Sequence, residues 1–135
     1  MQERRRMEDH IDNRRKIGKS GEDFVAEYLC KMGHSILERN WRSGHLEIDI
    51  ISIDSDGIHF VEVKTRKDNI QAPPQASVNG VKQKRIAQAS RRFLRSSKGL
   101  PYASDECFFD VAAVTFESGR HIIEWFPQAY IPMYL

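Results

Sequence analysis

Two neighbouring apolar segments constrain the fold of this chain more than any other feature. Residues 46–53 (LEIDIISI) and 58–65 (IHFVEVKT) flank the turn sequence DSDG at 54–57, a pattern that predicts a β-hairpin. Because successive side chains of a strand point to opposite faces, both segments place apolar side chains on both faces. Strands of this kind are usually covered on both sides, so the hairpin predicts a layered fold around a buried sheet.

Helix and strand patterns follow one another along the rest of the chain. The sequence SGED resembles a capping box and predicts a helix that begins near Ser20 and ends at Gly33. A basic helix is expected from about Ser77 to Ser97, ended by Gly99 and Pro101. Further strands are expected at 35–41, 107–116 and 120–126, and residues 67–75 are expected to form a loop. This order predicts an α/β or α+β sandwich with a mixed sheet.

The chain length of 135 residues is that of one domain. We expect a basic N-terminal extension at residues 1–16 and a single domain at 17–135. No segment approaches the ~18 apolar residues of a membrane span, and the charged N-terminus lacks the apolar stretch of a secretory signal. Cys30 and Cys107 form no CxxC pair, which disfavours a disulfide framework or a structural zinc site and predicts two buried, reduced thiols. A cytoplasmic protein is therefore expected.

Common catalytic motifs are missing from the sequence. It contains no P-loop, GxGxxG or GxSxG motif, which leaves nucleotide-binding and acyl-transfer functions without support. The five histidines show no HxH or HExxH pairing, and we interpret them as structural or surface residues. Of these, only His45, two residues before Glu47, is expected near the charged side chains of the hairpin.

Charge is unevenly distributed along the chain. Between Glu47 and Glu62 there are five acidic residues and no Lys or Arg, whereas between Lys64 and Lys98 there are ten basic residues and one acidic residue. A long basic stretch favours a polyanion such as nucleic acid as the partner, although a basic solvated helix face is an equally good interpretation of charge alone. The candidate nucleic-acid-binding residues are Arg66, Lys82, Lys84, Arg85, Arg91, Arg92 and Arg95.

The hairpin itself carries the candidate catalytic residues. A loop centred on Ser55-Asp56 places Asp49 opposite Glu62, and a loop centred on Asp56-Gly57 places Asp49 opposite Lys64. Either register gathers the three carboxylates of Glu47, Asp49 and Glu62 around one ammonium; a loop of odd length would move Glu62 to the other face. Ordinary cross-strand ion pairs are the alternative interpretation, but carboxylates in such excess repel one another, and a divalent cation would relieve the repulsion.

Ligands that are all oxygen favour Mg²⁺ or Mn²⁺ over zinc. We expect the cation to be held by Asp49, Glu62 and the backbone carbonyl of Val63, with Glu47 as a further candidate. Such an ion can bridge a phosphate oxygen and lower the pKa of its bound water. Lys64 would then stabilise the attacking hydroxide or the charge that develops on the phosphate. These groups are the minimum needed to hydrolyse a phosphodiester.

Two helical residues are further candidates. Glu22 lies on the core side of the first predicted helix. It is a candidate ligand of a second metal or of a water in the outer shell of the first; alternatively, it only complements the helix dipole. Lys82 shares the apolar stripe of Ile86 and Phe93 and is expected to point towards the sheet, although a structural lysine with a buried stem fits equally well.

Four segments resemble a known family. They are GKSGEDFVAEYLCKMGHSILERNWR (18–42), LEIDIIS (46–52), FVEVKTR (60–66) and FDVAAV (109–114). Together they are similar to the YraN-like family of bacterial proteins, which belongs to the restriction-endonuclease-like PD-(D/E)xK nuclease superfamily and resembles archaeal Holliday-junction resolvases in fold. The resemblance implies an α/β fold with a central mixed sheet of about five strands flanked by helices.

The resemblance also implies roles for single residues. Asp49, Glu62 and Lys64 fill the D…ExK positions, Glu22 matches the acidic residue of the first helix, and Glu47 matches the additional carboxylate of the EID motif. Two positions depart from the family pattern: Leu46 stands where Gly is usual, and Phe108 replaces the Arg of an Arg-Phe-Asp motif that ends here at Asp110.

The expected function is that of a Mg²⁺- or Mn²⁺-dependent endonuclease that acts on DNA, including branched or recombination structures. The alternative is a nucleic-acid-binding module that has the nuclease fold but little or no turnover. DNA is the expected partner; a membrane and a small-molecule cofactor are not expected, and a homodimer is left open.

Overall fold

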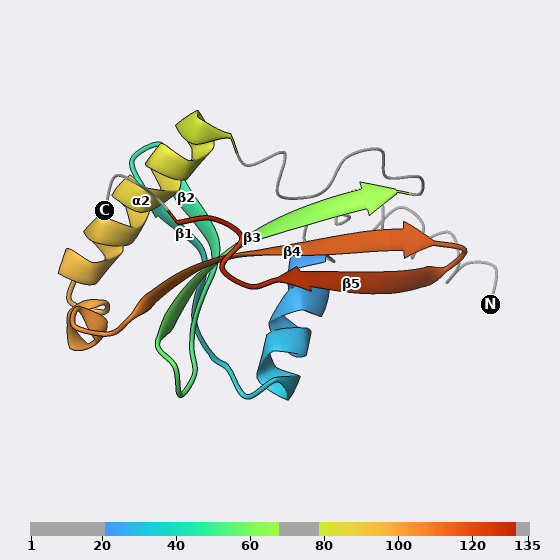
Figure 1. Ribbon diagram of the computed structural model, residues 1–135, viewed down its shortest axis with the longest axis horizontal. Helices are drawn as coiled ribbons and strands as arrows, with labels where there is room; N and C mark the ends of the chain where they lie inside the picture. Colours follow the sequence, from blue (N-terminus) through green and yellow to red (C-terminus); the bar gives the residue numbers. More distant parts are fainter. Residues whose placement is uncertain (1–20, 68–78, 132–135) are drawn as a thin grey trace, which may run out of the picture.

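The structure is a computed structural model that describes residues 21–67 and 79–131 (Figure 1). A first helix (residues 21–31) is followed by three strands, then by a second helix, a short 3₁₀ helix and two more strands. The bounds of the labelled elements are β1 Ser35–Ser43, β2 Leu46–Ile53, β3 Ile58–Lys67, α2 Gly80–Arg95, η2 Leu100–Tyr102, β4 Cys107–Glu117 and β5 Arg120–Phe126.

The five strands form one mixed sheet in the order β1-β2-β3-β4-β5. Neighbouring strands are antiparallel except β3 and β4, which run parallel. A parallel pair needs a long crossover, and α2 lies within the connection from β3 to β4. The predicted α/β fold with a five-stranded mixed sheet flanked by helices is confirmed.

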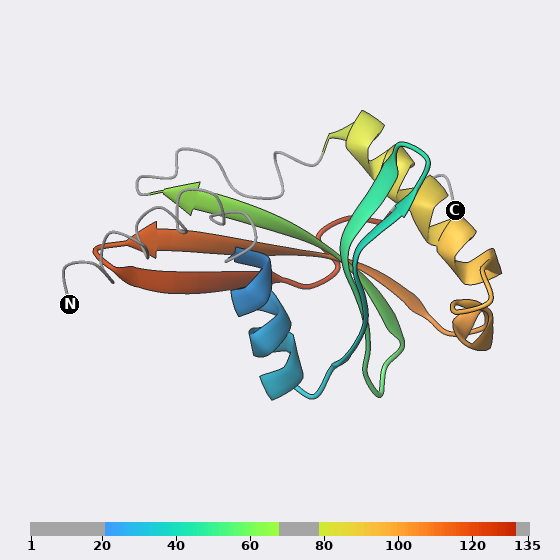
Figure 2. The same ribbon diagram turned by 180° about the vertical axis from the view of Figure 1, so that it is seen from behind.

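Two apolar clusters hold the helices to the sheet, and the helices lie on opposite sides of it (Figures 1 and 2). The first helix packs Val25 and Leu29 against Ile50 and Val61. The cluster on the other side joins α2 to the sheet through Ile86, Phe93, Ile48, Ile51, Phe60 and Val111. Since β2 and β3 contribute to both clusters, the hairpin is covered on both sides, as its sequence indicated.

The strands β2 and β3 separate part-way along their length. Their pairing runs only from Ile53↔Ile58 to Ile50↔Val61. Beyond that point β2 continues with β1, as far as Ser43↔Leu46, and β3 continues with β4, as far as Lys67↔Phe116. Figure 1 shows β1 and β2 turning away from β3, β4 and β5. We call the place where β2 and β3 part, at Asp49 and Glu62, the fork.

The predicted bounds of the basic helix are wrong at its described end. The helix α2 ends at Arg95, because the backbone N–H of Ser96 turns back to the carbonyls of Arg92 and Phe93. Gly99 comes after the helix instead of ending it, and it is required by close packing, since a Cβ there would lie 2.0 Å from the Phe93 carbonyl oxygen. At the other end the side chain of Asn79 caps the helix; residues 77 and 78 lie outside the described residues.

Other boundaries shift by only a few residues. The strands β1 and β3 each extend two residues further than predicted, so Lys67 belongs to a strand and not to a loop. Gly33, with φ at 96°, closes the turn after the first helix as expected. The expected extension at 1–16, Ser20 and loop residues 68–75 lie outside the described residues.

Both cysteines are free thiols, but the prediction that they are buried is wrong. Cys30 is exposed and Cys107 is partly buried. Cys30 follows the fully buried Leu29 on the first helix, so it lies on the side of that helix that faces away from the sheet. Within the described ranges, none of the helices combines the length and the apolar character needed to cross a membrane.

Candidate functional site

Asp49 lies where the sheet opens, and the backbone of β3 explains how it is held. The pairs from Ile53↔Ile58 to Ile50↔Val61 follow the first of the two predicted registers. Continued by one residue, this register brings Asp49 level with Glu62, just past the last pair. Beyond the fork the backbone of β3 is no longer bonded to that of β2. The N–H of Val63 instead donates a hydrogen bond of 2.8 Å to Asp49 Oδ2. The carboxylate of Asp49 therefore takes the place of a strand partner at the fork.

The environment of Asp49 disfavours its charged form. Burial raises the pKa of Asp49 to about 7 from 3.8, and the negative charge of Glu62 adds to the effect, with smaller contributions from Glu22 and Glu47. The hydrogen bond from Val63 opposes the rise. The other three predicted carboxylates thus all act on Asp49, which titrates near neutral pH.

Glu62 is neutralised by two lysines and not by one. Lys64 Nζ lies 3.2 Å from Glu62 Oε1, and Lys82 Nζ contacts the same oxygen. Burial opposes the change, but the hydrogen bond with Glu62 raises the pKa of Lys82. Burial and the neighbouring Lys82 lower the pKa of Lys64. The hairpin itself supplies one ammonium, Lys64, as its sequence predicted, and α2 adds the second, because Lys82 points towards the sheet.

The two outer carboxylates have weaker partners. Glu22 Oε2 is buried and forms no hydrogen bond among the described residues; the nearest cation is Arg39, whose Nη2 lies 3.8 Å away. That guanidinium makes its shorter contact, 2.6 Å, with Asp23. Glu47 is more exposed and lies 3.5 Å from Arg42 Nη2. Glu22 therefore points into the protein, as predicted, with unused hydrogen-bonding capacity.

A pocket of about 560 Å³ lies beside the fork, between β2, β3 and the first half of α2. The predicted site residues Glu47 and Glu62 line it from β2 and β3, and Lys82 and Arg85 line it from α2. His45 also lines it, as expected from its place in the sequence. The remaining lining residues are Leu46, Asn79, Val81 and Ile86. Acidic and basic side chains thus line the same pocket, and Lys82 and Glu62 contact each other there.

The basic residues of α2 fall into two groups. Lys82 and Arg85 lie at the pocket, while Arg91, Arg92 and Arg95 lie at the other end of the helix around a second hollow of about 280 Å³. Arg92 Nη1 is 3.3 Å from both the carbonyl and the hydroxyl oxygen of Ser43 in β1. Lys84 is exposed on α2, and Arg66 is half-buried in β3. Lys82 turns towards the sheet, as predicted, where it contacts Glu62.

Comparison with known proteins identifies the family of this chain. Residues 21–114 match the family described as "Uncharacterised protein family UPF0102". The chain belongs to the UPF0102 (YraN) family. A UPF0102 protein of Geobacter metallireducens is 38% identical over 86% of this chain and 93% of its own length. A UPF0102 protein of Anaeromyxobacter dehalogenans is 35% identical over 88% of this chain and 87% of its own length.

Among solved structures, this UPF0102 member is similar to SfsA of Pyrococcus furiosus, whose structure was determined in complex with Ca²⁺. The match covers 84% of this chain and 63% of that one, with a TM-score of 0.39 and 17% sequence identity. This chain thus spans less than two thirds of SfsA.

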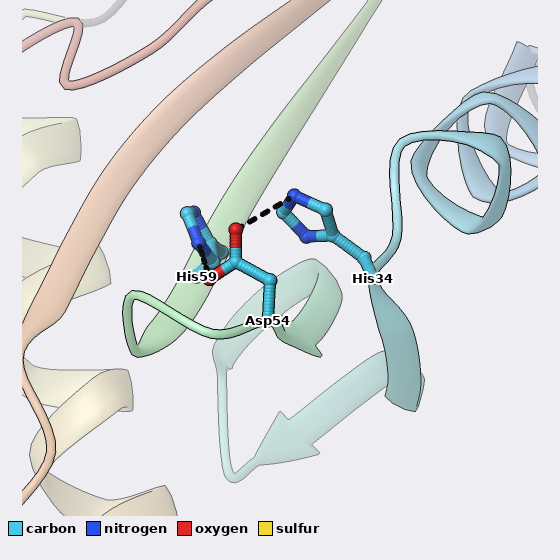
Figure 3. A group of neighbouring side chains, drawn as sticks. All are labelled: His34, Asp54 and His59. Atoms are coloured by element: carbon cyan, nitrogen blue, oxygen red, sulfur yellow. Dashed lines mark hydrogen bonds and ion pairs between the residues drawn. The ribbon is translucent and has the colours of Figure 1, made fainter.

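The structure of this UPF0102 member also brings together polar residues that sequence reasoning missed. His34, Asp54 and His59 converge at the β2–β3 turn (Figure 3). Asp110 extends the group, since its Oδ2 lies 2.6 Å from His59 Nδ1. His34 and His59 are both buried, and no spacing pattern relates them. One signal was available: His59 lies between Ile58 and Phe60 in a strand that is apolar on both faces, where a buried histidine needs polar partners. Of the other histidines, His121 stacks on Phe24, and His10 lies outside the described residues.

Proposed function

We propose that this protein is a divalent-metal-dependent nuclease that hydrolyses phosphodiester bonds in DNA. The observation that carries the proposal is the fork. There a half-buried carboxylate, Asp49, is surrounded by the negative charges of Glu62, Glu22 and Glu47, and Lys64 lies two residues beyond Glu62 on the same strand. A cluster of acids that raises the pKa of its central member to about 7 has a charge deficit that a cation would fill.

The residues present fit a hard divalent cation. The donors are carboxylate oxygens of Asp49 and Glu62 and the carbonyl of Val63, a set that suits Mg²⁺ or Mn²⁺. Glu47 stands at the rim, and the unpartnered buried oxygen of Glu22 can bind an outer water or a second ion. When bound, such a metal polarises a phosphate oxygen and lowers the pKa of its water.

Lys64 and Lys82 take different roles in this proposal. Lys64 is held beside Glu62 by strand periodicity, so its ammonium would stabilise the negative charge that develops on a phosphate bound next to Glu62. Lys82 neutralises Glu62 in the absence of metal and also lines the pocket with Arg85. A cation at Glu62 would release Lys82 towards a phosphate in the pocket. The exposed arginines of α2 then extend the phosphate-binding surface along the helix.

DNA with branches or other repair and recombination structures is the substrate class we propose, following the family resemblance of the fork motif. Two groups of cations lie at the two ends of α2, one of them at the fork, and together they can hold two segments of nucleic-acid backbone. The cytoplasm, where such DNA is found in bacteria, is the proposed location.

A nucleic-acid-binding module with little or no turnover is the second candidate. The observation that favours it is the double ion pair of Glu62, because Lys64 and Lys82 already neutralise the carboxylate that a metal would need. In this alternative the fork is a stable charge network, and α2 does the binding.

Cleavage assays on labelled linear, flapped and four-way-junction DNA distinguish the two functions. We expect cutting with Mn²⁺ or Mg²⁺ and none with EDTA. Lys64→Met keeps the length of the stem and removes the charge, so it should fold and bind DNA but lose about 10²-fold or more of the cleavage rate. Lys98→Met, which removes a surface ion pair 2.8 Å long with Glu38, is the matched control and should cut normally. DNA binding without cutting on any substrate would favour the binding module.

A further inference from the structure

A second cluster of ionisable side chains lies at the opposite end of the β2–β3 hairpin from the fork. Asp54 begins the turn after β2, His59 lies early in β3, and His34 lies between the first helix and β1. Asp54 is five residues further along the chain than Asp49, which corresponds to about 16 Å along a strand. The cluster is therefore a separate site, and it does not depend on the nuclease proposal.

The Nε2 atoms of both histidines point at the carboxylate of Asp54. Figure 3 shows the carboxylate of Asp54 between the two imidazole rings. His59 Nε2 lies 2.9 Å from Asp54 Oδ1, and His34 Nε2 lies 3.4 Å from Asp54 Oδ2. One ligand atom from each residue lies within 4.8 Å of the others. In a tetrahedral zinc site with bonds of about 2.0–2.1 Å, neighbouring ligand atoms are separated by about 3.3 Å, which lies within the 4.8 Å span of these three ligand atoms.

The other nitrogen of each ring is already bound to the protein. His59 Nδ1 lies 2.6 Å from Asp110 Oδ2, and His34 Nδ1 lies 2.9 Å from Ser52 Oγ. Asp110 is fixed in turn, because its Oδ1 accepts a hydrogen bond from the N–H of Gln128. Histidine ligands of metals commonly have such a partner on the remote nitrogen, which sets the tautomer and aims the near nitrogen at the metal.

Burial and charge also suit a cation. Only 3% of the His34 side chain and 9% of the His59 side chain are exposed, while Asp54 is 18% exposed and gives access from the turn. With neutral imidazoles, Asp54 and Asp110 leave two negative charges in this buried space, and Asp56 adds to the field at the turn. The ring of His59 is stacked on Phe108, which keeps it from rotating away.

We propose that His34, Asp54 and His59 bind a borderline divalent transition metal, with Zn²⁺ as the best-fitting ion. Two imidazoles and one carboxylate are a zinc ligand set with a fourth position left for water. Mg²⁺ is disfavoured because two of the ligands are nitrogen. The ion would join the hairpin turn to the segment before β1, and it would displace the protons that otherwise lie between the Nε2 atoms and Asp54.

The competing explanation is a hydrogen-bonded network of imidazolium and carboxylate groups that never binds metal. In that case His59 donates from both nitrogens, and no lone pair is available at Nε2. The two explanations differ in whether added zinc changes the ¹⁵N chemical shifts of Nε2 in His34 and His59, which NMR measures.

The test is a zinc titration of the full-length protein in excess Mg²⁺, followed by ¹⁵N NMR of the histidine side chains and by the visible spectrum of a Co²⁺ substitute. We expect a single zinc ion to bind, with metal-dependent shifts at Nε2 of His34 and His59 and a tetrahedral Co²⁺ spectrum. No binding, or shifts confined to His45 at the fork or to the exposed His121, would overturn the proposal. Because the titration uses the unaltered protein, its result does not depend on whether any variant folds.

Three variants sharpen the test. His34→Gln should weaken zinc binding by at least about 100-fold. Ser52 touches only the remote nitrogen of His34, Nδ1, so Ser52→Ala should weaken zinc binding by about 10-fold. His121→Gln is the matched control and should bind zinc as the unaltered protein does. If His34→Gln folds, judged by circular dichroism, and still binds zinc with unchanged affinity, the assignment of the site is wrong.

Discussion

Replacing Asp49 by Asn should make the metal-free protein more stable at high pH. Burial and then Glu62 raise the pKa of Asp49 to about 7, whereas the same group in the unfolded chain titrates near 3.8. Between these values the folded state binds the extra proton, so the free energy of unfolding falls as pH rises from about 4 to 7 and is level above that. Asn carries no charge and keeps a carbonyl oxygen for the Val63 N–H, so it should escape this loss.

The size of the effect follows from the two pKa values. The difference between 3.8 and about 7, at about 1.4 kcal/mol for each pH unit, corresponds to about 4 kcal/mol above pH 7. This is an upper bound, because Asp49 is half-buried and water and Lys82 screen part of the repulsion. We expect Asp49→Asn to gain about 1–3 kcal/mol over the unaltered protein at pH 8, and nearly nothing at pH 4.

Urea unfolding in EDTA, followed by the fluorescence of Trp41 and Trp125, measures this difference at each pH. Comparing the two proteins cancels the titrating groups that do not interact with Asp49, including His59. Asp105→Asn, which changes an exposed aspartate far from the fork, should show a difference that does not vary with pH. If Asp49→Asn is destabilised at pH 8, or if its gain is the same at pH 5 and pH 8, then the carboxylate cluster does not repel as we argue.

Three further predictions follow from the fork and from α2. Mg²⁺ or Mn²⁺ should raise the melting temperature of the unaltered protein, because a ligand of the folded state stabilises it, and should leave that of Asp49→Asn unchanged. Glu22→Gln should weaken Mn²⁺ binding in a calorimetric titration; a role limited to the helix dipole would instead cost about 0.3–1 kcal/mol of stability and leave metal affinity unchanged. Changing Arg91, Arg92 and Arg95 to Ala should lower the slope of log affinity for DNA against log salt by about 2–3, since about 0.7–0.9 is lost with each phosphate contact; an unchanged slope would move the binding surface elsewhere.

Local pattern was sufficient to predict the hairpin and the position of its charges. The strand at 46–53 and the turn at 54–57 have the predicted bounds, because alternation and turn chemistry are properties of neighbouring residues. Asp49 lies level with Glu62, just past the last pair, because one of the two predicted registers is correct. The α/β arrangement followed from the order of the elements.

What the sequence could not indicate depends on contacts between distant segments. The helical stripe predicted that Lys82 points towards the sheet, but its contact with Glu62 depends on how α2 crosses the fork. The meeting of His34 with His59 requires β1, β2 and β3 to lie side by side in the observed order, which no spacing rule contains. Asp110, left without a role when Phe108 replaced the usual Arg, is nearly fully buried and partners His59.

The two charged clusters of the hairpin are linked through its register. A slip of one residue between β2 and β3 would move every side chain of one strand to the other face, and Glu62 would no longer lie level with Asp49. The pairs Ile53↔Ile58 and Ser52↔His59 lie at the turn end, where the same residues bind His34 and Asp54. These hydrogen bonds require Ser52 to face His34 and His59 to face Asp54, so the buried polar network opposes a register slip between β2 and β3. A cation held by His34, Asp54 and His59 would oppose it further, and it would hold the carboxylates of the fork in place from the other end of the same two strands.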